Sequence, residues 1–222
     1  MIRRALVVAA LLALATPAYA QIRFEASIMG GYTFAEGVEG DAVITPSGTF
    51  NKIEVKSGGA INLQFGAVMH NGAEVGFIYS RQMSNLGLSG FDTRDLGRMN
   101  IDSYHGYIGY NFMPEGMFHP YFYIGFGATD YGPVNFTKAN GQPATINGPV
   151  RYSTTVGFGV KYWMNDHIGF RAGMIYTPTY ITAEAEGWWC DPYWGCYLVG
   201  DHKYSNQFQL NGGFSFRFGG GN

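Results

Sequence analysis

Apolar and polar side chains alternate along much of this chain, and the clearest stretch runs from residue 151 to residue 163. One face of this stretch carries Tyr152, Thr154, Val156, Phe158, Val160 and Tyr162. The other face carries Arg151, Ser153, Thr155, Gly157, Gly159, Lys161 and Trp163. Side chains of a strand point to alternate sides, so a period of two predicts a strand between an apolar and a polar environment.

Eight segments repeat this pattern, with short turns and long connections alternating between them. The segments are residues 22–34, 59–69, 73–80, 101–112, 121–128, 151–163, 168–177 and 207–218. Short turns are expected at 70–72, 114–120 and 165–167, and Asn71-Gly72 readily adopts the positive φ that a tight hairpin requires. Longer connections are expected near 35–58, 84–100, 130–150 and 182–205.

These segments predict an all-β protein, an eight-stranded antiparallel transmembrane β-barrel with short periplasmic turns and long extracellular loops. A soluble barrel of the lipocalin type has the same period but holds its apolar side chains inside. In this chain the mid-strand charges share a face with the glycines, and small residues suit a narrow interior. The opposite face is too apolar to meet water, which favours the membrane.

Composition points the same way. Charged residues make up 14% of the chain, against about 25% in soluble domains, while aromatic residues reach 17% and there are 33 glycines. A membrane barrel needs few charges and many interfacial aromatic side chains. The net charge of −2 gives no reason to expect nucleic acid as a partner.

The first twenty residues predict a secretory signal peptide. Arg3 and Arg4 precede an apolar stretch, and Ala18-Tyr19-Ala20 is a small-residue cleavage site. Residues 1–20 are therefore expected to be removed, leaving residues 21–222 as one barrel domain in a bacterial outer membrane. Outside the signal there is no apolar run of about 18 residues, the length that a transmembrane helix requires.

Charged residues gather at the periplasmic ends of the inward faces. They are Arg23, Glu25, Glu74, Lys161, Arg171 and Arg217. An isolated buried ion costs several kcal/mol, so charges in a narrow lumen must pair or be hydrated. One interpretation is a salt-bridge plug that closes the lumen. The alternative is a gate or weakly anion-selective filter, since four cations face two carboxylates.

The fourth long connection holds both cysteines of the chain. Cys190 and Cys196 are close in sequence and lie in an oxidising compartment, so a disulfide is expected. No metal site is expected there. Around the cysteines lie the aromatic residues Trp188, Trp189, Tyr193, Trp194 and Tyr197. These rings either pack at the membrane interface or form a surface that recognises an external partner.

An outer-membrane enzyme is a further alternative, because some barrels of this compartment modify lipid A with serine and histidine. Ser103, His105 and Tyr107 share one face of their strand. That face is predicted to point into the lumen, whereas such catalytic groups must face the lipid. No phosphate loop, nucleophile elbow or catalytic carboxylate pair stands out, so we expect neither enzymatic activity nor a cofactor.

One hairpin carries a family resemblance, and it runs from Gly157 through Asn165-Asp166-His167 to Arg171. Together with residues 74–82 and Phe214-Ser215-Phe216-Arg217-Phe218, it resembles the outer-membrane protein β-barrel domain family. That family contains small eight-stranded barrels similar to OmpX and the OmpA membrane domain. The resemblance implies insertion by the barrel-insertion machinery and a place among outer-membrane lipids and lipopolysaccharide.

The sequence as a whole predicts a non-enzymatic outer-membrane barrel with a structural or surface-interaction role. Its lumen is expected to be plugged by inward charges, and its outer loop to be tied by the disulfide. A narrow porin-like channel for small solutes or ions remains the alternative, with an outer-membrane lipid-modifying enzyme after it.

Overall fold

The computed structural model describes residues 22–45, 48–137, 141–181, 190–191, 195–196 and 203–219. The expected signal segment, residues 1–20, lies outside the described residues. All the described regular structure is β-strand, and no described helix is long and apolar enough to cross a membrane.

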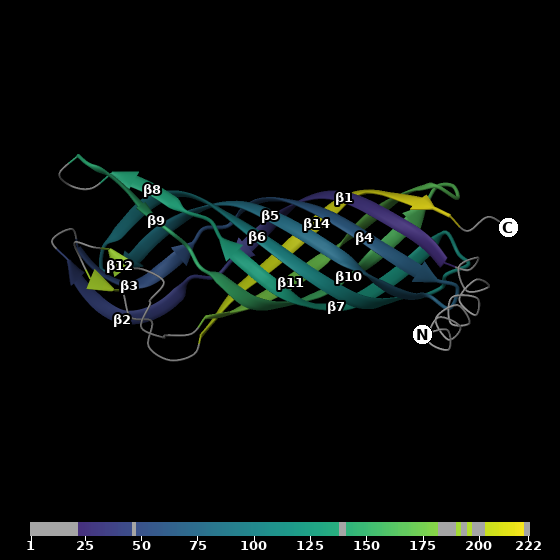
Figure 1. Ribbon diagram of the computed structural model, residues 1–222, viewed down its shortest axis with the longest axis horizontal. Coiled ribbons are helices and arrows are strands. Elements are labelled where there is room, and N and C mark those ends of the chain that lie inside the picture. Colours follow the sequence, from purple (N-terminus) through teal and green to yellow (C-terminus); the bar gives the residue numbers. More distant parts are fainter. Residues whose placement is uncertain are drawn as a thin grey trace, which may run out of the picture.

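Eight long antiparallel strands close into a barrel (Figure 1). They are β1 (Ile22–Ala35), β4 (Gly58–Met69), β5 (Ala73–Gly90), β6 (Thr93–Asn111), β7 (Phe118–Tyr131), β10 (Val150–Trp163), β11 (Ile168–Ile181) and β14 (Lys203–Phe218). Each pairs with its neighbours in chain order, and β1 pairs with β14 from Phe24↔Phe218 to Ala35↔Gln207. This last ladder closes the cylinder, and the predicted fold class is confirmed.

The two faces of the barrel strands have the predicted polarity. Phe65, Ile108 and Phe126 point outward and are more than half exposed. Asn62, Gln64 and most other polar residues of the strands point inward and are buried. An apolar outside and a polar inside are the arrangement of a membrane barrel, because the surrounding solvent is hydrocarbon.

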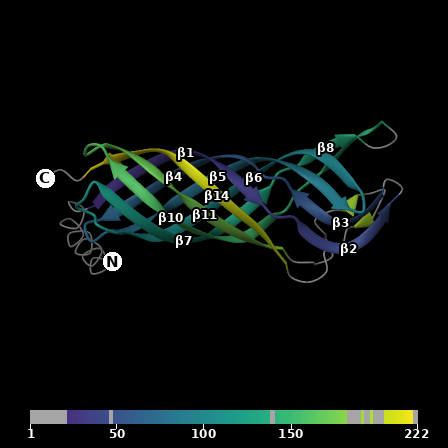
Figure 2. The ribbon, with the colours of Figure 1, turned by 180° about the vertical axis from the view of Figure 1, so that it is seen from behind.

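At one end of the barrel, called here the turn end, the connections are short. Residues 70–72, 112–117 and 164–167 join the strands there, and β1 begins and β14 ends at the same end (Figure 2). Gly72, with φ +89°, donates its amide hydrogen to the Met69 carbonyl oxygen, which is the tight turn that Asn71-Gly72 predicts.

At the opposite, hairpin end, strands continue beyond the apolar belt. The expectation of a long connection near 84–100 is wrong, because β5 and β6 run on as a hairpin that turns only at Phe91 and Asp92. The segment near 35–58 likewise forms β2 (Val38–Thr45) and β3 (Gly48–Val55), and β3 pairs with the outer part of β5. The hairpin of β8 (Val134–Thr137) and β9 (Pro143–Ile146) occupies part of 130–150.

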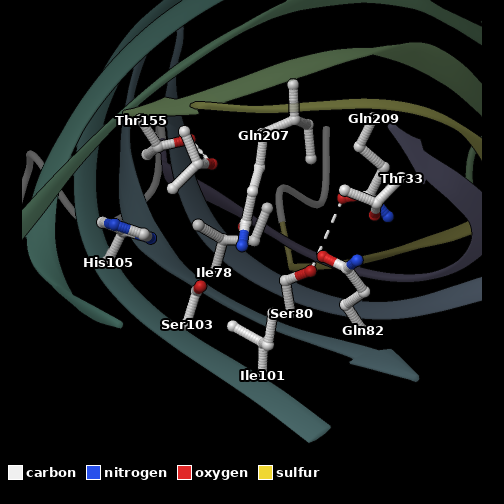
Figure 3. A pocket seen from close by; sticks show the side chains of 12 residues that line it. Thr33, Ile78, Ser80, Gln82, Ile101, Ser103, His105, Thr155, Gln207 and Gln209 are labelled. Atoms are coloured by element: carbon white, nitrogen blue, oxygen red, sulfur yellow. Dashed lines mark hydrogen bonds between the residues drawn. The ribbon is translucent and has the colours of Figure 1, made fainter. Parts of the chain in front are cut away.

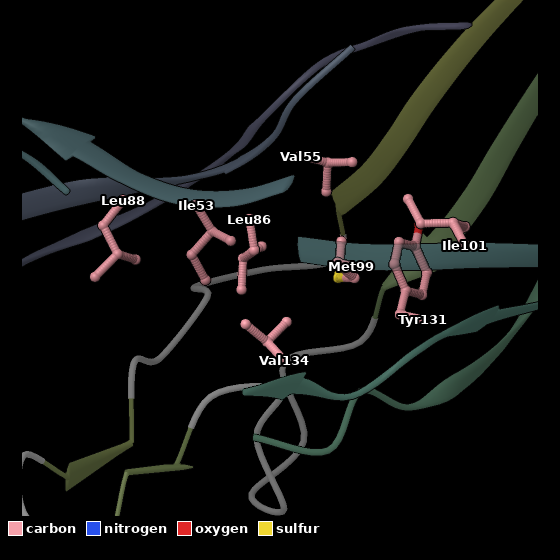
Figure 4. Close-up of a cluster of buried hydrophobic side chains, with 8 residues drawn as sticks. All are labelled: Ile53, Val55, Leu86, Leu88, Met99, Ile101, Tyr131 and Val134. Carbon is pink, nitrogen blue, oxygen red and sulfur yellow. The ribbon is translucent and has the colours of Figure 1, made fainter. Parts of the chain in front are cut away.

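The polarity of the two strand faces reverses in this extension. Within the barrel, β5 turns apolar side chains outward, but beyond Met83 its apolar Leu86 and Leu88 are buried on the inner side. They pack in a hydrophobic cluster at the hairpin end (Figure 4). The cluster consists of Ile53, Val55, Leu86, Leu88, Met99, Ile101, Tyr131 and Val134. Such a reversal is expected where a strand leaves lipid and enters water.

Candidate functional site

A network of buried charges crosses the lumen near the turn end. The ammonium group of Lys161 lies 2.6 Å from the Glu25 carboxylate and 2.8 Å from the Glu74 carboxylate. The three residues come from β10, β1 and β5, which are not neighbours in the barrel wall. These ion pairs therefore run across the lumen, and all three side chains are buried.

Two arginines complete the network. Arg217 lies 3.0 Å from the Glu25 carboxylate through its Nη2 atom, and its guanidinium stacks over the Trp163 ring at 3.8 Å. Arg171 is 1% exposed, with its Nη1 atom 3.9 Å from the Glu74 carboxylate and its guanidinium 4.0 Å from the centre of the Tyr121 ring. Aromatic faces stabilise these cations where water is excluded.

Neutral side chains donate further hydrogen bonds to the Glu74 carboxylate. The Tyr107 hydroxyl donates a hydrogen bond of 2.6 Å to Glu74, and the Asn111 amide donates one of 2.8 Å. With Lys161, three groups therefore donate hydrogen bonds to the carboxylate that Arg171 also pairs with. A buried charge that is paired and fully hydrogen-bonded is tolerated, whereas an unpaired one is not.

Tyrosine rings fill the lumen directly above the charges. Tyr123 is 2% exposed and contacts Gly157, where an added Cβ would overlap the ring. Tyr121 stacks on Tyr123 with the two ring planes 8° apart, and Gly173 lies against its hydroxyl. The inward glycines of β10 and β11 therefore provide the space into which the large side chains of β7, the strand that pairs with β10, fit.

A band of uncharged polar residues lies between the tyrosines and the hydrophobic cluster. It surrounds a small cavity of about 20 Å³, into which Gln207 and Gln209 of β14 and Ser80 and Gln82 of β5 point (Figure 3). His105 lines the same cavity. Along the lumen, from the turn end outward, the lining is thus charged, then aromatic, then neutral polar and finally apolar.

Comparison with known proteins agrees with this architecture. A family model for the outer membrane protein beta-barrel domain matches residues 6–218. The chain belongs to this family. No curated protein sequence matches the chain.

Three solved structures show similar folds. OprG from Pseudomonas aeruginosa is 15% identical, with a TM-score of 0.65 over 89% of this chain and 96% of that one. AlkL in lipid bilayers is 14% identical, with a TM-score of 0.53 over 90% of this chain and 92% of that one. Neisserial surface protein A is 13% identical, with a TM-score of 0.50 over 89% of this chain and 97% of that one. At these identities the likeness shows the fold alone.

Membership of the outer-membrane barrel family places the chain in the outer membrane of a Gram-negative bacterium. In such barrels the short turns face the periplasm and the longer connections face outside. The charged network then lies near the periplasm, and the hydrophobic cluster lies beyond the membrane.

The predicted charge cluster comes together except for Arg23. Glu25, Glu74, Lys161, Arg171 and Arg217 contact one another as described, whereas Arg23 is half-buried and forms no ion pair with a described residue. The network that forms therefore has three cations and two carboxylates. Its role in closing the lumen stays a prediction.

The sequence does not identify the aromatic and amide side chains that contact the charged network. Tyr107, Tyr121 and Trp163 sit at inward positions of the alternation, and so does Asn111. Alternation indicates that a residue faces the lumen, but not which residues meet there. The run Tyr121-Phe122-Tyr123 was the one signal for them, since two inward rings on one strand require small residues opposite.

The enzyme alternative rests on residues that face the lumen in the structure. His105 is buried, and its Nε2 lies 2.8 Å from the Ser153 hydroxyl. Thr129 links Ser153 to Ser103 through hydrogen bonds of 2.9 Å and 3.0 Å. Because these groups point away from the lipid, they have no access to a lipid substrate at the barrel surface.

The cysteine loop is described only in part. Cys190 and Cys196 are opposite each other in the antiparallel ladder between β12 (Cys190–Asp191) and β13 (Gly195–Cys196). The expected recognition residues Trp188, Trp189, Tyr193, Trp194 and Tyr197 lie outside the described residues. Among the described residues, no three His, Cys, Asp or Glu side chains are grouped to hold a metal ion.

Proposed function

We propose that this protein is a non-enzymatic barrel of the outer membrane, closed near the periplasm by its charged network and active through contacts at its outer surface. The main support for a closed lumen is the position of Lys161. It lies between two carboxylates on other parts of the wall, at 2.6 Å and 2.8 Å, and has 0% exposure.

The energetics of the network support closure. Removing one partner of a buried ion pair costs about 3–5 kcal/mol, because the other charge is left unpaired. A passing ion would have to separate Lys161 from Glu25 or Glu74, or move Arg171 from Tyr121. An eight-stranded barrel is also narrow enough for side chains to fill it.

Conductance in a planar lipid bilayer tests this proposal. The purified wild-type protein is expected to give no steady single-channel steps in potassium chloride. Lys161→Ala removes the ammonium group that joins the two carboxylates and is expected to give openings, whereas Lys56→Ala on the exposed extension is the control and should stay closed. Steady wild-type steps whose ion selectivity reverses in Arg171→Glu would rule out the plug.

The runner-up function is a narrow channel in which the charged network acts as a gate. It is favoured by the neutral polar band and by the neighbouring Asn62 and Asn211 amides, which are buried without a hydrogen-bond partner among the described residues. Unpaired buried amides are costly, so this band favours hydration. Under this alternative, the same bilayer recordings show rare openings with weak anion selectivity.

The outer contact is assigned to the cysteine hairpin. In-register pairing of Cys190 with Cys196 supports a disulfide, which would hold the neighbouring aromatic residues in a fixed arrangement. Reduction is expected to raise the intact mass by about two hydrogens. Cys190→Ser combined with Cys196→Ser should leave the barrel folded but change its protease sensitivity in this hairpin. An unchanged mass on reduction would exclude the disulfide.

The absence of enzymatic activity is part of the proposal and has its own test. Ser103→Ala, Ser153→Ala and His105→Ala are expected to leave the lipid A of the host strain unchanged. A lipid A species that disappears in any of these variants, but not in a Ser80→Ala control, would establish an enzyme instead.

A further inference from the structure

The outward face of the β5–β6 extension holds a cleft of about 640 Å³. Its floor is formed by two cross-strand pairs, Met83↔Asn100 and Asn85↔Arg98. Gly132, Pro133 and Asn135 add a side wall from the segment that leads from β7 into β8. Nothing in the proposed function uses this cleft.

The cleft lies just outside the apolar belt. Strands rise about 3.3 Å per residue, and a tilt of 35–45° leaves about 2.5 Å of height per residue. The step of about ten residues from Phe112, just past the end of β6, to Asp102 on β6 therefore spans about 25 Å. This is the height of the lipid-facing band. Met83↔Asn100 and Asn85↔Arg98 are the next outward pairs beyond Arg81↔Asp102.

Local chemistry marks the same boundary. Tyr79 and Tyr104 face outward with ring centres 5.2 Å apart, and the Tyr79 hydroxyl donates to Asp102. Arg81 binds Asp102 through two hydrogen bonds of 2.7 Å and 2.8 Å. A paired charge above an aromatic pair is typical of the membrane–water interface. The cleft begins one residue pair farther out.

The only formal charge among the cleft residues is Arg98. Its side chain is exposed and forms no ion pair with a described residue, unlike Arg81. The nearby carboxylates of Asp95 and Asp102 already bind Lys56 and Arg81. Asp130 is opposite Asp102 in the ladder, on the membrane side of the cleft.

Amide groups supply the rest of the cleft's hydrogen-bonding capacity. Asn100 has an exposed side chain with no partner among the described residues. Asn135 accepts a hydrogen bond from Thr145 through its carbonyl oxygen, so its amide hydrogens are free to donate. Amides both donate and accept, which suits sugar hydroxyls, and a guanidinium binds a phosphate through two parallel hydrogen bonds.

We propose that this cleft binds the phosphorylated sugar headgroup of the glycolipid in the outer leaflet. Arg98 binds a phosphate group, and Asn100 and Asn135 hydrogen-bond the sugar hydroxyls. Met83, half exposed at the lower rim, contacts the first acyl carbons. The occupant is the membrane glycolipid because the cleft opens at the height where its headgroups lie.

Binding of rough lipopolysaccharide to the full-length protein in detergent tests the proposal. Arg98→Gln is expected to lower the affinity about ten-fold, since a charge-assisted pair is worth about 1.5 kcal/mol or more. Arg23→Gln is the matched control, because it removes the same charge from an arginine without a described ion-pair partner at the periplasmic end. A shift in gel mobility between unheated and heated samples checks that each variant is folded.

Three further probes identify the ligand. Lipid A without phosphate should bind wild-type protein about as weakly as intact lipopolysaccharide binds Arg98→Gln. Phosphatidylglycerol carries a phosphate but no sugar, so it should bind wild-type protein more weakly than lipopolysaccharide does; equal affinity for the two lipids would mean that the cleft does not recognise the sugar. Equal loss in Arg23→Gln, or equal affinity for free glucosamine 1-phosphate, would overturn the assignment to a membrane glycolipid.

Discussion

Two lysines of this protein form ion pairs of similar length in opposite surroundings. Lys161 lies 2.6 Å from the Glu25 carboxylate inside the barrel, whereas Lys56 lies 2.9 Å from the Asp95 carboxylate on the exposed extension. Solvent screens the second pair but not the first. Geometry alone therefore does not rank the two pairs, and burial does.

Replacing each lysine by methionine measures this difference. Lys161→Met removes the ammonium group that two buried carboxylates share and leaves Glu25 only Arg217, and Glu74 only Arg171, as a cationic partner. The free energy of unfolding should therefore fall by about 3–5 kcal/mol. Lys56→Met should lower it by at most about 1 kcal/mol. Urea unfolding of protein in lipid vesicles, followed by tryptophan fluorescence, gives both values. Equal losses would mean that the lumen network is hydrated and weak.

A single methyl group added at Gly157 should also lower the stability of the barrel, because the Tyr123 ring occupies that space. Gly157→Ala is expected to destabilise the barrel by about 1–3 kcal/mol through overpacking. Gly106 faces outward, and a Cβ added there would have no other atom within 4 Å, so Gly106→Ala should change stability little. The same urea experiment compares them, and a harmless Gly157→Ala would show that Tyr123 moves freely.

At the scale of elements, the reversal of polarity along β5 separates a barrel part from an extension. Inside the membrane the strand is held by ladders on both sides, and beyond Met83 it is held by β3, β6 and the hydrophobic cluster. Each part therefore has its own interior. A substitution in one interior should act mainly on that part.

Leu86→Asp tests this separation. Leu86 is 0% exposed in the hydrophobic cluster, so a carboxylate there should open the extension while the barrel stays folded. Trypsin should then cut faster after Lys52, Lys56 or Arg98 in vesicle-embedded protein, with unchanged heat-modified gel mobility. Phe91→Asp is the control, since Phe91 is 93% exposed at the hairpin turn. Loss of the mobility shift in Leu86→Asp would show one common interior.

The same reversal explains how far the sequence could predict the fold. The eight barrel strands and their faces follow from one alternation, with apolar residues on the lipid side. Past Ser84 the apolar residues move to the other face, among Gly and Ser, so the pattern favours a loop where the strand in fact continues. Likewise, the alternation places the Lys161 side chain in the lumen. It does not predict the ion pairs of Lys161 with Glu25 and Glu74, because these depend on how strands distant in the sequence are arranged in the barrel.

At the scale of the whole molecule, the two ends of the barrel should be exposed to different compartments. An epitope inserted after Asp92, in the β5–β6 turn, is expected to bind antibody on intact cells. The same epitope after Asp166, in the short turn between β10 and β11, should be detected only after the outer membrane is permeabilised. The reverse pattern would invert the orientation and place the charged network outside.

The ladder between β1 and β14 has a consequence for the time course of assembly. Ser27 and Ser215 share a hydrogen bond of 2.7 Å although they are 188 residues apart. Chain segments this distant meet late, because the entropy lost on bringing two ends together grows with their separation. Until β14 arrives, both β1 and β11 present unpaired edges. Substitutions in β14 should therefore slow the assembly of the barrel more than they lower the stability of the assembled barrel.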